Sequence, residues 1–128
     1  MLSPQNHKVY EHAIATLWFD EDGILNFISK PVHRDLAIMM DYVNFVKSIS
    51  TEKVCLLADI SHTTPLDKET REYLGKHLQD IYKAMALLSN RPGPEMVGKT
   101  FLALNDQPYP TAMFHDVNSA RTWLKQYV

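Results

Sequence analysis

Hydrophobic and polar positions change their spacing several times along the chain, and each change predicts a new element. From Val9 to Phe19 apolar residues fall on both faces of an extended segment, and residues 20–23 then supply turn formers before a second apolar run at 24–29. Gly23 can adopt the positive φ that a tight turn needs. The pattern predicts a β-hairpin of two strands.

The next segment switches to helical spacing and then back to a strand pattern. Apolar residues three and four positions apart predict a helix from Arg34 to Ser48. The continuous apolar run 54–58 is typical of a strand buried on both faces of a parallel sheet. Asp67 is placed to cap a second helix, which we expect to end near Asp80.

Residues 81–89 allow two interpretations. Periodicity alone would continue the second helix to Ser89, but a helix from Asp67 to Ser89 is long for a domain of this size. Residues 84–88 also have the composition of a buried strand. The interpretation that we favour is a helix to about Asp80 followed by a strand.

The last third of the chain predicts a helix, a short strand and a closing helix. Residues 90–94 are rich in Pro and Gly and break the chain before a third helix. That helix has three apolar residues on one face: Val97, Phe101 and Leu104. Residues 111–114 fit a last strand, and Asp116 can cap the closing helix.

These elements follow one another in the order ββαβαβαβα. Strands that alternate with helices pair in parallel through right-handed crossovers, so the helices must pack on the sheet. We therefore expect an α/β fold with a mixed sheet of about five strands. With 45% hydrophobic and 22% charged residues, the 128-residue chain suits a single domain, residues 1–128, with residues 1–7 as a flexible N-terminal tail.

Composition removes several classes of partner. The net charge of -2 gives no attraction to nucleic acid or to an anionic membrane. We see no leader and no apolar segment near the roughly 20 residues that span a bilayer, so we expect a cytoplasmic protein without membrane insertion. The single Cys55 excludes an intrachain disulfide and suits a reducing compartment.

The sequence motifs favour neither an enzyme nor a cofactor. The four glycines form no Gly-x-Gly-x-x-Gly or Walker loop, and the chain has no Gly-x-Ser-x-Gly elbow. Four side chains that follow predicted strands could hold a divalent metal or form an acid–base pair: Asp59, His62, His115 and Asp116. Helix capping and loop hydrogen bonds explain them as well, so we assign no metal site and no catalytic residue.

Several short segments resemble uncharacterised bacterial proteins related to the STAS domain, the domain of sulfate transporters and anti-sigma-factor antagonists. They are Ala58-Asp59-Ile60-Ser61, Asp67-Lys68-Glu69-Thr70-Arg71-Glu72-Tyr73-Leu74, residues 84–88, Phe114-His115-Asp116 and Ala120-Arg121-Thr122-Trp123-Leu124. The resemblance implies a small α/β domain that binds a partner protein. In the family this binding is sometimes switched by phosphorylation of a serine at the start of the helix after the central strand.

The sequence departs from the family at that switch. The family's Asp-Ser-Ser-Gly stretch falls on Asp67-Lys68-Glu69-Thr70, which contains no serine. Thr64 and Thr70 are the candidates for phosphorylation that remain nearby, because a phosphate at a helix N-terminus would be stabilised by free N–H groups.

The resemblance therefore predicts a non-enzymatic protein-interaction or regulatory module whose partner is another protein or a second copy of the chain. Its predicted contact residues are Asp59, Ser61, His62, Thr63, Thr64, Asp67, Lys68 and Arg71. An alternative is a small apolar-ligand (lipid-like) binding protein with a pocket between helices and sheet, as the related CRAL-TRIO lipid-binding proteins would suggest. A third interpretation is a metal-dependent enzyme at the carboxyl edge of the sheet.

Overall fold

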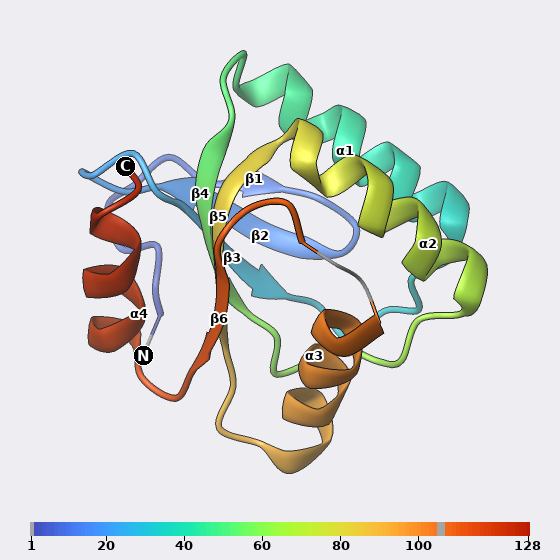
Figure 1. The fold of residues 1–128 in the computed structure, drawn as a ribbon. Coiled ribbons are helices and arrows are strands. Elements are labelled where there is room, and N and C mark those ends of the chain that lie inside the picture. Colours follow the sequence, from blue (N-terminus) through green and yellow to red (C-terminus); the bar gives the residue numbers. More distant parts are fainter. Residues whose placement is uncertain (1, 105–106) are drawn as a thin grey trace.

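The structure is a computed structural model that describes residues 2–104 and 107–128, without the side chain of Leu104. In these residues six strands form one mixed sheet. The strands are β1 (Tyr10–Glu11), β2 (Ala15–Phe19), β3 (Leu25–Ser29), β4 (Val54–Asp59), β5 (Tyr82–Leu88) and β6 (Thr111–Phe114). The helices are α1 (Leu36–Ile49), α2 (Lys68–His77), α3 (Pro92–Leu104) and α4 (Val117–Lys125), and a 3-10 turn, Leu78–Asp80, follows α2. Figure 1 shows the arrangement.

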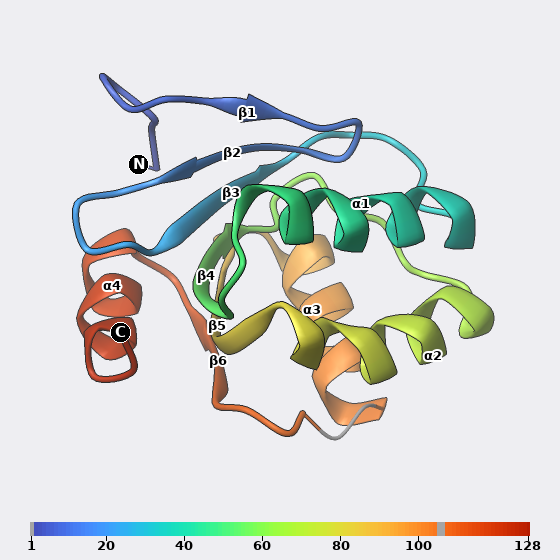
Figure 2. The ribbon, with the colours of Figure 1, turned by 90° about the horizontal axis from the view of Figure 1, so that it is seen from above.

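The strands lie in the sheet in the same order as in the sequence, β1 to β6. β1, β2 and β3 are antiparallel neighbours, whereas β3, β4, β5 and β6 run parallel. Parallel neighbours are joined by right-handed crossovers. Because β4, β5 and β6 are each added at the same edge of the sheet, every crossover helix lies on the same face. Figure 2 shows this result, with α1, α2 and α3 on one face and α4 on the other.

The two faces of the sheet bury separate cores. Side chains that alternate along β4 illustrate this, because Leu56 and Ala58 face α1 and α2 whereas Cys55 and Leu57 face α4. The order of elements and the α/β class predicted from the sequence are confirmed. The sheet contains one more strand than expected.

The additional strand comes from the segment Val9–Phe19, for which the prediction of one continuous strand is wrong. The chain reverses between β1 and β2, where the His12 and Ala15 backbones exchange two hydrogen bonds of 2.9 and 3.3 Å. The buried His12 ring accepts a bond from the Ile14 N–H and donates one of 2.7 Å to Asp41 on α1. Both faces of this segment are apolar, so alternation alone could not reveal the turn.

The prediction of a flexible tail at residues 1–7 is also wrong for the part that the structure describes. Leu2 is only 5% exposed and packs in the α4-side core with Trp18 and Leu124. The His7 ring contacts the Glu21 carboxylate at 2.7 Å. A single large apolar residue is enough to hold this segment against the sheet.

Residues 81–89 form the strand that we favoured. α2 ends at His77, and β5 lies between β4 and β6, where its backbone bonds to both neighbours. The helix starts predicted from Asp67 and Asp116 are present, since these side chains accept hydrogen bonds of 2.8 Å from the backbones of Thr70 and Ser119. Asp35 caps α1 in the same way, so this helix begins at Leu36 rather than at Arg34. No described helix is long and apolar enough to cross a membrane.

A buried polar network fixes the hairpin between β2 and β3. The nearly buried Asp20 carboxylate accepts bonds from the N–H groups of Asp22 and Ile24 and, at 3.1 Å, from the amide of buried Asn26. The Arg121 guanidinium of α4 lies 3.5 Å from the same carboxylate. One side chain therefore closes the turn and connects it to the helix on that face.

Asp20→Ala would remove the side-chain acceptor of the Asp22 and Ile24 N–H groups and one of the two acceptors of the Asn26 amide, which keeps the Ile24 carbonyl. We expect the free energy of unfolding to fall by about 2–3 kcal/mol, because several donors lose an acceptor at once. Urea denaturation followed by circular dichroism measures this value. The control is Asp22→Ala, whose exposed carboxylate lies 3.8 Å from Lys125 and whose removal should change stability by less than about 1 kcal/mol. Equal effects of the two substitutions would contradict the role assigned to Asp20.

Candidate functional site

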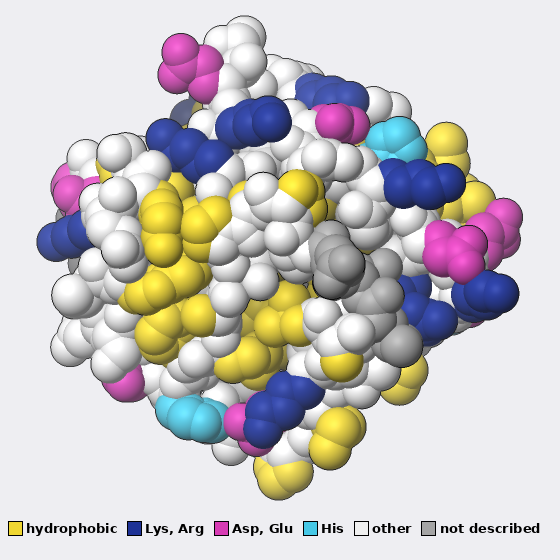
Figure 3. All heavy atoms as spheres, in the orientation of Figure 1, with side chains coloured by type: hydrophobic (Ala, Val, Ile, Leu, Met, Phe, Trp, Pro, Cys, Tyr) yellow, Lys and Arg dark blue, Asp and Glu magenta, His cyan; other side chains and the backbone are white. Residues whose placement is uncertain are grey.

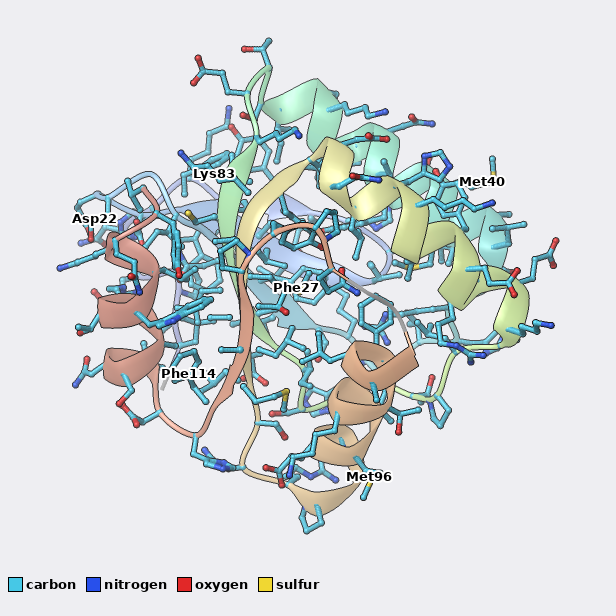
Figure 4. All side chains as sticks on the ribbon, in the orientation of Figure 1. Asp22, Phe27, Met40, Lys83, Met96 and Phe114 are labelled. Atoms are coloured by element: carbon cyan, nitrogen blue, oxygen red, sulfur yellow. The ribbon has the colours of Figure 1, made fainter. Side chains whose placement is uncertain are left out.

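A pocket of about 130 Å³, hereafter the apolar pocket, lies between the sheet and the layer formed by α1, α2 and α3. Its floor is formed by side chains from β3, β4 and β5: Phe27, Leu56, Ala58, Met85 and Leu87. Its walls are formed by side chains from the three helices: Met39, Tyr42, Leu74, Val97, Gly98 and Phe101. Figure 4 labels Phe27 among the side chains between the sheet and these helices.

Two small residues line the apolar pocket. Ala58 belongs to the floor, with the larger Leu56 on its own strand and Leu87 opposite it on β5. Gly98 brings α3 close to the sheet, because a Cβ atom at this position would lie 2.9 Å from Ile60 Cδ1 and 3.1 Å from Met113 Sδ. The surface view in Figure 3 shows apolar side chains between α3 and α4, on both sides of β6.

One charged side chain borders the apolar pocket. Arg34 is only 4% exposed, and its Nη2 donates to the carbonyl oxygens of Ile14 and Lys30 at 3.2 and 3.3 Å. Its Nη1 has no hydrogen-bond acceptor among the described residues. Burial lowers the pKa of Arg34, since the charged form loses its hydration.

Two buried tyrosines add hydroxyl groups to the same wall. Tyr42 on α1 and Tyr82 on β5 form a short hydrogen bond between their hydroxyls and both border the apolar pocket. Burial raises the pKa of both phenols, so they stay protonated near neutral pH. A pair of phenols has two O–H donors, and their mutual bond uses one. The second remains a donor for another group.

Sequence reasoning missed the importance of Arg34, Tyr42 and Tyr82. Arg34 marked only the start of the first helix, and Tyr42 lay within that helix without any role assigned to it. A buried arginine has no signal in a single sequence, because its burial depends on segments distant along the chain. Lys30 and Ile14, which accept its hydrogen bonds through their carbonyls, come from either end of the β2–β3 hairpin.

The predicted partner-binding loop divides into two parts. Ile60, Thr63, Thr64 and Leu66 border the apolar pocket, and the Thr63 hydroxyl donates to the Ile60 carbonyl at 2.7 Å. Asp59 accepts from both the backbone N–H and the hydroxyl of Ser61, at 2.9 and 2.5 Å. The loop is therefore part of the pocket wall as well as a surface.

The other predicted contact residues lie on the outside of this loop and at the start of α2. His62, Asp67 and Lys68 are exposed, and Arg71 is half-buried. Hydrogen bonding by Thr70 lowers the pKa of Asp67. Lys68 lies 3.9 Å from Glu72, and the Arg71 guanidinium is 3.5 Å from the Leu66 carbonyl.

The two candidates for phosphorylation differ in accessibility. Thr64 is exposed, so its phosphorylation stays a prediction. Thr70 is fully buried beneath the first turn of α2, and its proposal as a phosphorylation site is wrong for the folded chain because no kinase could reach the hydroxyl. Whether a threonine is accessible to a kinase depends on the face of the helix on which it lies. The resemblance to the family's Asp-Ser-Ser-Gly stretch does not indicate that face.

Three of the four side chains of the metal interpretation have other partners, and the fourth, His62, is exposed. Asp59 bonds to Ser61, and Asp116 caps α4. His115 Nδ1 is 2.9 Å from the Ser89 carbonyl, while its Nε2 is 3.4 Å from Glu95. No group of three or more His, Cys, Asp or Glu side chains in the described ranges is close enough to hold a metal ion.

Comparison with known proteins identifies the family and the fold. A family model described as "Domain of unknown function (DUF7793)" matches residues 17–128, and the chain belongs to this family. No curated protein matches the chain. A crystal structure of an uncharacterized protein from the DUF3478 family with a SpoIIAA-like fold, from Shewanella loihica PV-4, is 20% identical and superimposes with a TM-score of 0.59.

That match covers 97% of this chain and 99% of the Shewanella protein. At this identity it shows the fold and not a shared activity. The chain thus has the SpoIIAA-like fold, which is the fold of STAS domains, and the resemblance seen in the sequence is confirmed at the level of fold.

Enlarging an alanine on each face of the sheet tests whether the apolar pocket is real free space. Ala58→Leu adds its carbons to the pocket, so we expect the free energy of unfolding to change by less than about 1 kcal/mol. The matched control is Ala86→Leu, on the neighbouring strand but in the filled core under α4. Overpacking there should destabilise the protein by about 1–3 kcal/mol. Chemical denaturation measures the free energy of unfolding of both variants. Equal losses of stability would mean that the pocket has no room for a larger side chain.

Proposed function

We propose that this member of the DUF7793 family binds a small apolar molecule in the apolar pocket. The observation that carries the proposal is the pocket itself, which borders three helices and three strands and is lined almost wholly by aliphatic, aromatic and thioether side chains. An apolar cavity of about 150 Å³ is large enough to bind benzene. A pocket of about 130 Å³ therefore suits a ligand of similar size.

The lining supplies the contacts that such a ligand requires. Phe27 presents an aromatic ring on the floor, and Met39 and Met85 contribute flexible thioethers that adapt to ligand shape. The surface that the lining residues expose to the pocket is almost wholly apolar, so an apolar molecule that moves there from water buries its own surface against apolar groups. The binding of an apolar body follows from this chemistry.

A protein-interaction function is a second proposal, supported by the outer surface of the loop at residues 60–67. His62, Thr64 and Pro65 are exposed next to the exposed start of α2. The same loop contributes Thr63 and Leu66 to the apolar pocket. A partner that contacts this surface would thus contact a segment that a bound ligand also touches.

Ligand binding is tested with toluene as the probe, close to its limit of solubility. We expect the melting temperature in sealed-cell calorimetry to rise, because a ligand at a hundredfold its Kd stabilises the folded state by about 2.7 kcal/mol. Ala58→Leu should abolish the rise, since the added side chain occupies the ligand's space.

The matched control is Ala86→Val, which enlarges a residue on the opposite face of the sheet and leaves the pocket lining unchanged. This variant should keep the full response to toluene. No shift in the unmodified protein, or an equal shift in Ala58→Leu, would overturn the proposed function.

Self-association through the loop surface is tested by sedimentation equilibrium. If two copies meet there, the protein should sediment as a dimer, and Thr64→Glu should shift it toward monomer because a symmetric contact brings the two new carboxylates together. Lys76→Glu, an exposed position at the far end of α2, is the control and should leave the dimer intact. A monomeric unmodified protein at high concentration would contradict this self-association.

A further inference from the structure

The Arg34 guanidinium is the one feature of the apolar pocket that an apolar ligand does not explain. It is buried just before α1, beside the residues that precede β2 and follow β3. Its partners are two backbone carbonyls, and among the described residues no carboxylate pairs with it. Nη1 carries two N–H donors that have no acceptor in this part of the chain.

A buried cation in this condition is energetically unfavourable. Removing a charge from water is costly unless an opposite charge or a full set of hydrogen bonds replaces the solvent. Arginine remains protonated even when burial lowers its pKa, so loss of the proton does not remove the cost. Arg34 is one of the residues that line the ligand-sized pocket, so an anionic ligand there would supply the missing opposite charge.

A second polar side chain of the pocket wall, Tyr42, also bears on the ligand. Tyr42 lies close enough to Arg34 for the two groups to interact electrostatically. The hydroxyl of Tyr42 is bonded to that of Tyr82, and the pair keeps one O–H donor beyond their mutual bond. Arg34 and the tyrosine pair therefore bring a positive charge and spare N–H and O–H donors to the wall of the apolar pocket, a combination that suits an anion.

We propose that the ligand of the apolar pocket is a small monocarboxylate whose carboxylate pairs with Arg34 and whose apolar body lies on Phe27 and Ala58. This inference rests on the proposed function and adds the chemical class of the ligand. A carboxylate oxygen accepts from Nη1, and the charge assists the hydrogen bond. The size of the pocket limits the body to a short branched chain or a single ring.

The test compares acids with their neutral amides of the same shape. The full chain is titrated calorimetrically with benzoate and benzamide, and with the smaller pair butyrate and butyramide. The ratio of the two Kd values in each pair gives the preference for the charged ligand. We expect the better-fitting acid to bind at least about tenfold more tightly than its amide, as a charge-assisted hydrogen bond implies. This comparison requires no variant and so does not depend on how a substitution folds.

Two substitutions of Arg34 then test whether this residue causes the preference for the acid over the amide. Arg34→Met keeps a long side chain without charge and should bind the acid no more tightly than the amide, while it still binds toluene. Arg34→Lys keeps the charge but not the planar fork, and its preference should lie between the two. The matched control Arg71→Met removes a guanidinium outside the pocket lining and should leave the preference unchanged.

The outcomes separate the two proposals. Toluene binding without a preference for the acids would overturn the carboxylate inference and leave the apolar-ligand function standing. Absence of binding by toluene, the acids and the amides would overturn both. A preference that survives in Arg34→Met would overturn the role of Arg34.

Discussion

The handedness of the crossovers through α1, α2 and α3 is the constraint on which the rest of the structure depends. A right-handed connection between adjacent parallel strands always places its helix on the same side when the chain keeps stepping in one direction. Three helices therefore share one face, and only α4 is described on the other. The crowded face has to fit three helices over one twisted sheet, and the apolar pocket lies where they meet the sheet.

The contrast between the two faces follows from the size of their side chains. On the α4 face, the small residues Ala84 and Ala86 let one helix pack directly on the strands, and Trp18 fills the remaining space. On the other face, Ala58 lies among larger floor residues, and the apolar pocket lies between that floor and three helices. Small residues thus permit close packing on one face and leave space on the other, because the elements that cover them differ.

The polar groups buried in the structure show a similar contrast. Asp20 is surrounded by donors from its own hairpin and by Arg121, so its charge is compensated within the chain. Arg34 has only carbonyl partners, its Nη1 has no acceptor among the described residues, and it lines the same pocket as Tyr42 and Tyr82. The charge of Asp20 is thus explained within the chain, whereas that of Arg34 is the observation on which the carboxylate proposal rests.

The sequence by itself determined the element types, their order and most of their limits, because periodicity and capping are local properties. Val54–Asp59 was recognisable from its continuous apolar run, and α4 from Asp116 and the apolar residues after it. It did not determine the turn at residues 12–14, the burial of Leu2 and Thr70, or the site. Arg34, Tyr42, Ala58 and Tyr82 come from four segments that meet only after the crossovers have stacked α1 to α3 on one face. Only the tertiary structure decided which of them share a pocket, because burial and hydrogen-bond partners depend on contacts between residues that are distant in the chain.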